Sequence, residues 1–294
     1  MNTHQIIEYT KKKFEVEFPI PKIDYDIWQT IYRRWESSID DELLNEYLPL
    51  REPVIKLVYK GLYGEMPFDK EYVLKYYERS FEGLEYLFYP SSDCKKIFVF
   101  FSGYSNRKTY NRYSWYWDPE EKWSQDTTYV FIRDPNNLWY SDPDLVTKLT
   151  RLLALVVDDE NLSFKDCMFV GGSMGAYGAL RYGISLGADK VVAIHPQLSL
   201  LPTKFHDDET WFNNISSVGN SFVDISKIVK GNLPKIFLEF GEYKADKVAA
   251  NELINAYDAE QGTLVISKHN SSGHVTNSPS KLLLDSIFNF FDFI

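Results

Sequence analysis

A serine with glycines on both sides lies at residues 171–175, in the order Gly-Gly-Ser-Met-Gly. The G-x-S-x-G pattern in this stretch is typical of serine nucleophiles, and it makes Ser173 the candidate attacking group. The pattern directly follows an apolar segment at 167–170 and precedes a helical segment at 174–186. The start of a helix favours the negative charge that develops during attack. We therefore predict a nucleophile elbow at Ser173; the alternative is a glycine-rich turn whose serine does no chemistry.

A serine hydroxyl is a weak nucleophile unless a base removes its proton, so a histidine is expected further along the chain. The sequence contains five histidines: His4, His195, His206, His269 and His274. Only the last two follow the last predicted strand, and the base is expected after the acid. His274 is favoured because it lies in a flexible turn just before the final helix, whereas His269 lies close to the strand end. His195 ends a different strand. The alternative for His274 is a helix-capping or surface histidine.

The acid is expected after the strand that precedes the one leading to the base. The segment 235–240 is predicted as that strand, and Glu242 and Asp246 follow it. Asp246 is favoured because it lies in the loop toward the next helix, where a carboxylate can reach the Nδ1 of an imidazole. Glu242 is the alternative acid. Asp246 could also be the N-cap of that helix, a role that is compatible with catalysis.

Acyl transfer also needs two backbone N–H groups that stabilise the oxyanion. We expect one from Met174, directly after the nucleophile, and the other from the loop after the third predicted strand. In that loop Gly103 allows a sharp turn, which leaves the N–H of Tyr104 free to point inward. The alternative is an ordinary strand-to-helix turn at 101–106.

The elements that would carry these residues alternate between apolar strands and helices. Predicted strands lie at 54–60, 84–89, 96–101, 128–133, 167–170, 191–194, 235–240 and 264–267. Predicted helices lie at 142–157, 174–186, 245–257 and from 280 to the end, the first with Asp142 as its cap and Pro143 in its first turn. Unbroken apolar strands are buried on both faces, as in parallel sheets. The alternation predicts an α/β fold with a mostly parallel, doubly wound sheet.

Two segments depart from this alternation. Residues 1–53 have a helical, polar and aromatic pattern and are predicted to form an N-terminal extension to a domain at 54–294. Residues 197–233 lie between the sixth and seventh predicted strands without a strand of their own, and they are predicted to form a cap-like insertion. Its rings, Trp211 among them, could cover a cleft; the alternative is that they hold the insertion against the domain.

The composition disfavours several classes of partner. Lys and Arg number 32 against 42 Asp and Glu, which gives a formal net charge of −10. Nucleic acids and anionic membranes need a basic surface, so neither is expected as the main partner. The cysteines and histidines lack the spacing of metal ligands, so no metal is expected. No apolar run approaches the roughly 20 residues of a bilayer span, and no signal peptide is visible. We expect a soluble, cytoplasmic protein.

The stretch Val170–Leu180 (VGGSMGAYGAL), supported by Ile194–Gln197 (IHPQ), resembles the α/β-hydrolase superfamily. The chain is similar, over roughly residues 54–294, to bacterial esterases and O-acetyltransferases associated with polysaccharide or glycoprotein modification. The resemblance implies an α/β-hydrolase fold with these site residues: nucleophile Ser173, acid Asp246, base His274, and oxyanion donors Tyr104 and Met174. One departure is Ser102, where common hydrolases have a histidine; the oxyanion hole uses backbone groups and does not depend on it.

Aromatic residues make up 16% of the chain and crowd the segment after the predicted oxyanion loop. Trp115 and Trp117 in that segment, and Trp211 in the insertion, are candidate substrate-binding residues, because flat rings stack on the faces of sugars. The alternative is that these rings pack into the core. The sequence thus predicts a serine esterase that removes a short acyl group, with a carbohydrate as a candidate carrier of that group.

Two other functions remain open. An O-acyltransferase would form the same acyl-enzyme and pass the acyl group from a donor such as acetyl-CoA to a sugar hydroxyl. A non-catalytic binding or assembly protein on a hydrolase scaffold is the second alternative, and residues 1–53 and the aromatic surface would then do the work. Apart from acetyl-CoA as a co-substrate, no cofactor is expected. The expected partner is a small-molecule or glycan ester, and the oligomeric state is not predicted.

Overall fold

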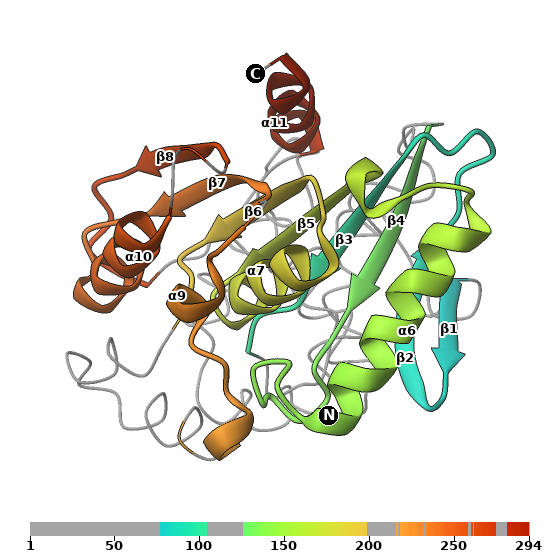
Figure 1. Cartoon of the computed structure of the whole chain (residues 1–294), viewed down its shortest axis with the longest axis horizontal. Helices are drawn as coiled ribbons and strands as arrows, with labels where there is room; N and C mark the ends of the chain where they lie inside the picture. Colours follow the sequence, from blue (N-terminus) through green and yellow to red (C-terminus); the bar gives the residue numbers. More distant parts are fainter. Residues whose placement is uncertain are drawn as a thin grey trace, which may run out of the picture. The chain divides into compact units, whose positions relative to one another are not determined.

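The computed structural model describes residues 77–104, 126–198, 216, 218–231, 233–257, 260, 262–274 and 281–293 (Figure 1). The predicted extension at 1–53, the strand predicted at 54–60 and much of the predicted insertion at 197–233 lie outside these residues. Among the described residues, no helix has both the length and the apolar character that crossing a membrane requires.

Eight strands of the described residues form one sheet, in the order β1-β2-β4-β3-β5-β6-β7-β8. Their bounds are β1 Glu78–Phe81, β2 Leu84–Tyr89, β3 Lys96–Phe101, β4 Thr127–Ile132, β5 Cys167–Gly172, β6 Lys190–Ile194, β7 Lys235–Phe240 and β8 Leu264–Lys268. β2 pairs antiparallel with β1 and with β4, whereas the other neighbouring strands pair in parallel. The prediction of a mostly parallel sheet is therefore confirmed (Figure 1).

The helices of the described residues lie in the connections between the strands and after the last one. Their bounds are α6 Pro143–Asp159, α7 Met174–Leu186, α9 Ile225–Ile228, α10 Lys244–Ala256 and α11 Lys281–Phe293, with short 3-10 helices at η3 Phe164–Asp166 and η5 Gly219–Ser221. The start of α6 is the predicted one: the carboxylate of Asp142 accepts the N–H groups of Asp144 and Leu145. Such a cap satisfies donors that have no partner within the helix.

Most predicted bounds agree with the structure to within one residue. β4 begins and ends one residue earlier than predicted, and β5 runs two residues further, to Gly172. β1 was not predicted. It is a four-residue strand at the sheet edge whose two middle residues are exposed, so its sequence carries no apolar run.

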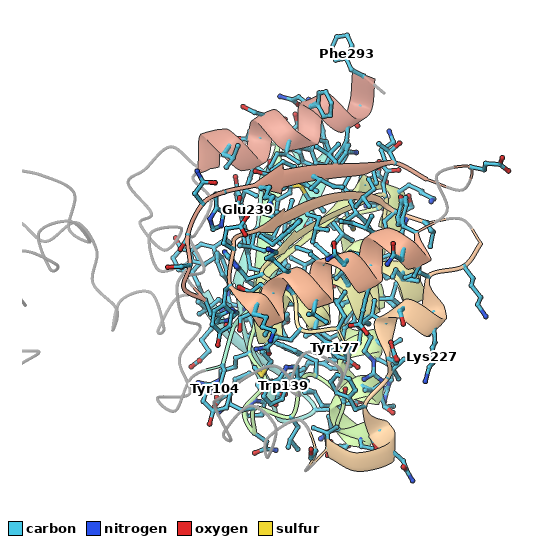
Figure 2. All side chains as sticks on the ribbon, turned by 90° about the vertical axis from the view of Figure 1, so that its left-hand side faces the viewer. Tyr104, Trp139, Tyr177, Lys227, Glu239 and Phe293 are labelled. Atoms are coloured by element: carbon cyan, nitrogen blue, oxygen red, sulfur yellow. The ribbon has the colours of Figure 1, made fainter. Side chains whose placement is uncertain are left out.

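Helices cover both faces of the sheet, which confirms the predicted double winding. On β3, Ile97 and Phe101 belong to a core cluster that also includes buried residues of α6, α7 and α10. Side chains alternate along a strand, so Phe98 lies on the opposite face, where its ring is 5.5 Å from that of Phe288 in α11. Figure 2 shows α11 and α10 on opposite sides of the sheet.

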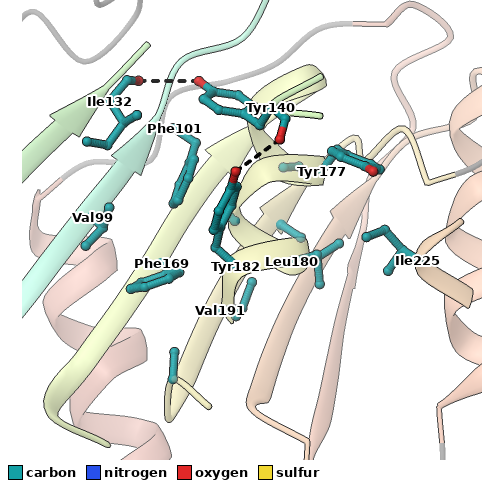
Figure 3. Packing of buried hydrophobic residues seen from close by; sticks show 14 of the residues in the cluster. Val99, Phe101, Ile132, Tyr140, Phe169, Tyr177, Leu180, Tyr182, Val191 and Ile225 are labelled. Carbon is teal, nitrogen blue, oxygen red and sulfur yellow. Dashed lines mark hydrogen bonds between the residues drawn. The ribbon is translucent and has the colours of Figure 1, made fainter. Parts of the chain in front are cut away.

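Buried tyrosines tie α7 to the loop after β4 (Figure 3). The hydroxyl of Tyr182 in α7 donates to the carbonyl of Tyr140 at 3.1 Å. The hydroxyl of Tyr140 lies 3.3 Å from the carbonyl of Ile132, at the end of β4. Because each hydroxyl has a backbone acceptor, these large side chains can be buried without an unpaired polar group.

The order of the strands reverses at β3. β4 lies on one side of β3 and β5 lies on the other. Where the order of a parallel sheet reverses, a crevice forms at the carboxyl ends of the strands, and ligands bind there. The loop after β3 begins at Ser102, and the turn after β5 carries Ser173. The predicted nucleophile therefore lies at the position where this fold class places its ligands.

Candidate active site

Ser173 joins β5 to α7 in a strained conformation. Its φ of 58° and ψ of −123° form a combination that residues with a side chain rarely adopt. Its N–H donates to the carbonyl of Ile194, at the end of neighbouring β6, at 2.8 Å. The turn is thus continuous with β5 and hydrogen-bonded to β6. The side chain of Ser173 is only partly buried. This is the geometry that the predicted elbow requires.

Two glycines let the chain close around this turn. A Cβ atom on Gly171 would lie 2.1 Å from the carbonyl oxygen of Gly175, and one on Gly175 would lie 2.1 Å from the carbonyl oxygen of Phe101. Neither position has room for a side chain. Because Gly171 has no side chain, the start of α7 can lie close to the end of β5. Because Gly175 has none, the first turn of α7 can lie close to the end of β3 and the loop that follows it.

The structure brings the predicted nucleophile, base and acid together. His274 Nε2 lies 2.9 Å from Ser173 Oγ, and His274 Nδ1 lies 2.8 Å from Asp246 Oδ1. Both distances are those of good hydrogen bonds. A carboxylate accepts and does not donate, so the proton of His274 lies on Nδ1 and Nε2 accepts the hydroxyl of Ser173. The arrangement can remove a proton from Ser173.

Asp246 is a buried carboxylate that remains charged. Its side chain is 0% exposed, and burial acts to raise its pKa, but hydrogen bonds from His195 and His274 outweigh burial and hold the pKa below its ordinary value. Asp246 lies in the first turn of α10, whose N-cap is Tyr243. The suggestion that Asp246 is itself the N-cap is therefore wrong, because the helix begins three residues earlier than the cap would require. The helix start still favours its negative charge.

Glu242, the alternative acid, lies in a different environment. Its two carboxylate oxygens pair with Lys247 at 2.8 Å and Lys268 at 2.7 Å. The hydrogen bonds from these two lysines lower the pKa of Glu242 to about 2. Glu242 is thus a partly exposed ion-paired residue, and the described contacts link Asp246, not Glu242, to the histidines.

The alternative base, His269, does not contact Ser173 in the described network. Its Nε2 lies 3.2 Å from Nε2 of His195, and its Nδ1 accepts the N–H of Ser271 at 3.2 Å. His4 and His206, which the sequence also offers, lie outside the described residues.

The sequence prediction missed His195. This residue follows β6, its side chain is 0% exposed, and its Nδ1 lies 2.7 Å from Asp246 Oδ2. The carboxylate of Asp246 therefore contacts two histidines, one on each oxygen. The position of His195 at the end of β6 could have indicated this contact, because β6 lies between β5, which leads to Ser173, and β7, which leads to Asp246.

The two predicted oxyanion donors lie on adjacent segments. Met174 is the first residue of α7, so its N–H has no acceptor within the helix. The carbonyl of Ser102 accepts the hydroxyl of Tyr140 at 2.8 Å, which holds the start of the loop that leads to Tyr104. The role of the Tyr104 and Met174 N–H groups in binding an oxyanion stays a prediction.

The predicted substrate-binding residues Trp115, Trp117 and Trp211 lie outside the described residues. Tyr104, which begins the aromatic segment, is described: it is 36% exposed, and its ring centroid lies 6.1 Å from that of Trp139 (Figure 2). The indole N–H of Trp139 donates to Gln197 at 2.6 Å. The exposed ring of Tyr104 therefore lies near the buried ring of Trp139, at the end of the predicted oxyanion loop that the structure describes.

Among the residues that the structure describes, two groups of side chains have the spacing of metal ligands: His195, Asp246 and His274, and His195, Glu239 and His269. In the first group, His274 Nε2 is engaged by Ser173 and both oxygens of Asp246 accept N–H groups. In the second, a metal on His269 Nε2 would require a proton on Nδ1, but Nδ1 accepts the N–H of Ser271. The hydrogen bonds favour a network of side chains over a metal centre in both groups.

No family model matches this chain, and no curated protein matches it. Among solved structures, the capsule O-acetyltransferase of Neisseria meningitidis serogroup A matches with a TM-score of 0.51 and 16% identity, over 74% of this chain and 91% of that chain. An inhibited esterase B from Lactobacillus rhamnosis matches with a TM-score of 0.50 and 17% identity, over 74% and 84%. At this identity the likeness concerns the fold. The predicted resemblance to esterases and O-acetyltransferases is thus confirmed, and the chain shares its fold with one enzyme of each kind.

Proposed function

We propose that this chain is a serine-dependent acyl-transfer enzyme that hydrolyses a short acyl ester through an acyl-enzyme on Ser173. The observation that carries the proposal is the continuous hydrogen-bonded connection from Ser173 Oγ through His274 to Asp246, with distances of 2.9 and 2.8 Å. The strained turn at Ser173 and the burial of Asp246 support it, because both are costly features that a structural turn does not need.

The reaction follows from the positions of the protons. Ser173 Oγ attacks the ester carbonyl while its proton passes to His274 Nε2, and Asp246 stabilises the imidazolium that forms. The negative oxygen of the tetrahedral intermediate is held by the N–H groups of Met174 and Tyr104. His274 then returns the proton to the leaving alcohol, which leaves the acyl group on Ser173. Water, activated by His274, releases the acid in a second cycle of the same steps.

The acyl-enzyme could also pass its acyl group to a sugar hydroxyl, with acetyl-CoA as the acyl donor. The fold shared with a capsule O-acetyltransferase supports this second candidate. Hydrolysis and transfer share every step up to the acyl-enzyme and differ in whether water or a hydroxyl attacks it. A carbohydrate is the proposed carrier in both cases, because the sequence after Tyr104 is rich in aromatic residues, whose rings stack on sugars.

The first test is turnover of p-nitrophenyl acetate by the wild type and by Ser173→Ala, with intact mass measured during turnover. We expect release of nitrophenol and a transient mass increase of one acetyl group, both lost in Ser173→Ala. Ser163→Ala is a matched control, because Ser163 caps η3 before β5, at the opposite end of that strand. It should lose some stability and keep its turnover.

The second test separates the acceptors. Acetyl-labelled substrate is supplied with and without an oligosaccharide, and the label is followed into free acetate or into the glycan.

An organophosphonate probe that labels wild type but not Ser173→Ala would show the activated serine even if the acetate ester fits poorly. Full turnover by a folded Ser173→Ala variant would contradict the proposal and favour a non-catalytic role.

A further inference from the structure

The carboxylate of Asp246 is held from two sides. His274 Nδ1 lies 2.8 Å from Oδ1, and His195 Nδ1 lies 2.7 Å from Oδ2. The side chains of Asp246 and His195 are both 0% exposed. Because water does not reach the carboxylate, the oxygen that His274 leaves free needs a protein donor, and among the described residues His195 is the group placed to supply it.

The protons of this network can be assigned along the chain of contacts. His269 Nδ1 accepts the N–H of Ser271, so the proton of a neutral His269 lies on Nε2. That proton points to His195 Nε2, 3.2 Å away, which must then be the acceptor. The proton of a neutral His195 therefore lies on Nδ1 and is donated to Asp246. With both histidines neutral, one assignment satisfies these three hydrogen bonds, and the carboxylate of Glu239, 4.0 Å from His269 Nε2, also favours a proton on that nitrogen.

His195 is held in an unfavourable backbone conformation to make this contact. Its φ is 48°, in the left-handed region that a residue with a large side chain rarely adopts. Its N–H donates to the carbonyl of Glu239 in β7 at 2.8 Å, so its backbone still pairs with β7 while its side chain points toward α10. Strain of this kind persists where the surrounding structure imposes it, and it gathers at functional sites.

We propose that His195 is a positioning residue for the acid Asp246: its Nδ1–H fixes the rotation of the carboxylate and pairs the oxygen that His274 does not use. His269 supports the assignment by donating to His195 Nε2, which keeps the His195 proton on Nδ1. The inference rests on the proposed function, since it takes Asp246 and His274 as acid and base. His195 does not contact Ser173 in the described network, so it acts through Asp246.

The first measurement is made on the wild-type protein without substrate. Nitrogen NMR of the ¹⁵N-labelled histidine rings reports which ring nitrogen carries the proton. We expect the Nδ1–H form for His195 and the Nε2–H form for His269, with the His195 signals assigned by comparison with His195→Asn. An Nε2–H form of His195 would overturn the proposal, and this result does not depend on any activity.

The second measurement compares two variants of His195. His195→Asn keeps a donor near the position of Nδ1, and asparagine tolerates a positive φ. His195→Phe keeps the ring shape and removes the donor. We expect His195→Phe to lower kcat by roughly 10- to 100-fold, the range seen for hydrogen bonds that support ligand histidines, with KM nearly unchanged. His195→Asn should recover most of this loss.

The control is a double-mutant cycle with Asp246→Asn. If His195 acts through the carboxylate, adding His195→Phe to Asp246→Asn should not lower kcat further. Equal losses in both backgrounds, or a His195→Asn variant no better than His195→Phe at equal melting temperature, would overturn the proposal. If the wild type shows no ester turnover while NMR gives the expected tautomers, the proposed function fails and the hydrogen-bond assignment stands.

Discussion

The hydroxyl of Tyr140 donates a 2.8 Å hydrogen bond to the carbonyl of Ser102, at the start of the loop that leads to Tyr104. The same hydroxyl lies 3.3 Å from the carbonyl of Ile132. Tyr140 is fully buried, so removing its hydroxyl removes a buried hydrogen bond to the carbonyl of Ser102, whereas the carbonyl of Ile132 keeps the N–H of Ser102 at 2.9 Å. The start of the predicted oxyanion loop is thus held by a side chain from the loop after the neighbouring strand.

Tyr140→Phe should therefore lower both stability and rate. We expect a loss of about 0.5 to 1.5 kcal/mol in the free energy of unfolding, the net contribution of a typical hydrogen bond, and a several-fold lower kcat. Tyr257→Phe is the matched control, because the Tyr257 hydroxyl also lies between two carbonyls, those of Pro234 and Thr263, before β7 and β8. Denaturant unfolding and ester kinetics on both variants separate the effects; an equal kcat loss in the control would contradict the assignment.

Gly175→Ala should abolish turnover. The new Cβ would lie 2.1 Å from the carbonyl oxygen of Phe101, so the first turn of α7 must move away from the end of β3, where the predicted oxyanion loop begins. Gly183→Ala is the control in the same helix: its Cβ would lie 2.5 Å from Cγ2 of buried Val191, so it should cost stability without displacing the first turn of α7. We expect folded protein with wild-type turnover from Gly183→Ala. Circular dichroism and kcat/KM on both variants provide the test.

Asp246→Asn should lower kcat by a factor on the order of 10⁴, because an amide in place of the acid favours the wrong tautomer of His274. Glu242→Gln should leave kcat within about twofold of the wild type, since its carboxylate pairs with lysines on the surface. Steady-state kinetics on the pair distinguishes the two acids. A larger loss in Glu242→Gln than in Asp246→Asn would reverse the assignment.

Glu242 should contribute to the pH dependence of stability. Its hydrogen bonds to Lys247 and Lys268 lower its pKa from 4.5 to about 2, so the folded state binds the proton less tightly than the unfolded state. The stabilisation is complete above about pH 4.5 and is lost as the pH falls toward 2. Glu242→Gln should therefore melt lower than the wild type at pH 6, with a difference that narrows in acid and in high salt. A difference that grows on acidification would have the wrong sign.

The main elements could be predicted from the sequence because each depends on local pattern. The apolar runs of β3 and β7 and the Asp142-Pro143 start of α6 are signals carried by consecutive residues. The elbow is of the same kind, since the glycines around Ser173 lie within five residues of one another. β1 escaped prediction because two of its four residues are exposed, so pairing with β2, not its own pattern, makes it a strand.

The order along the chain also predicted that Ser173, an acid after β7 and a histidine after β8 would lie together, but it left pairs of candidates for the last two. Asp246 and Glu242 lie four positions apart, and His269 and His274 lie five positions apart. At such short separations, side-chain direction decides the contacts. α10 begins at Lys244 and places Asp246 on its buried side, whereas Glu242 precedes the helix and meets two lysines.

By itself, the sequence determined the α/β alternation, the elbow at Ser173 and the shortlist of acids and bases. Only the tertiary structure decided that His195 contacts Asp246, a residue 51 positions away. The physical reason is the pairing of β6 between β5 and β7, together with a left-handed backbone at His195, which turns one imidazole toward a buried carboxylate. Neither the order of distant strands in the sheet nor a single unusual φ produces a periodic pattern of residues from which it could be predicted.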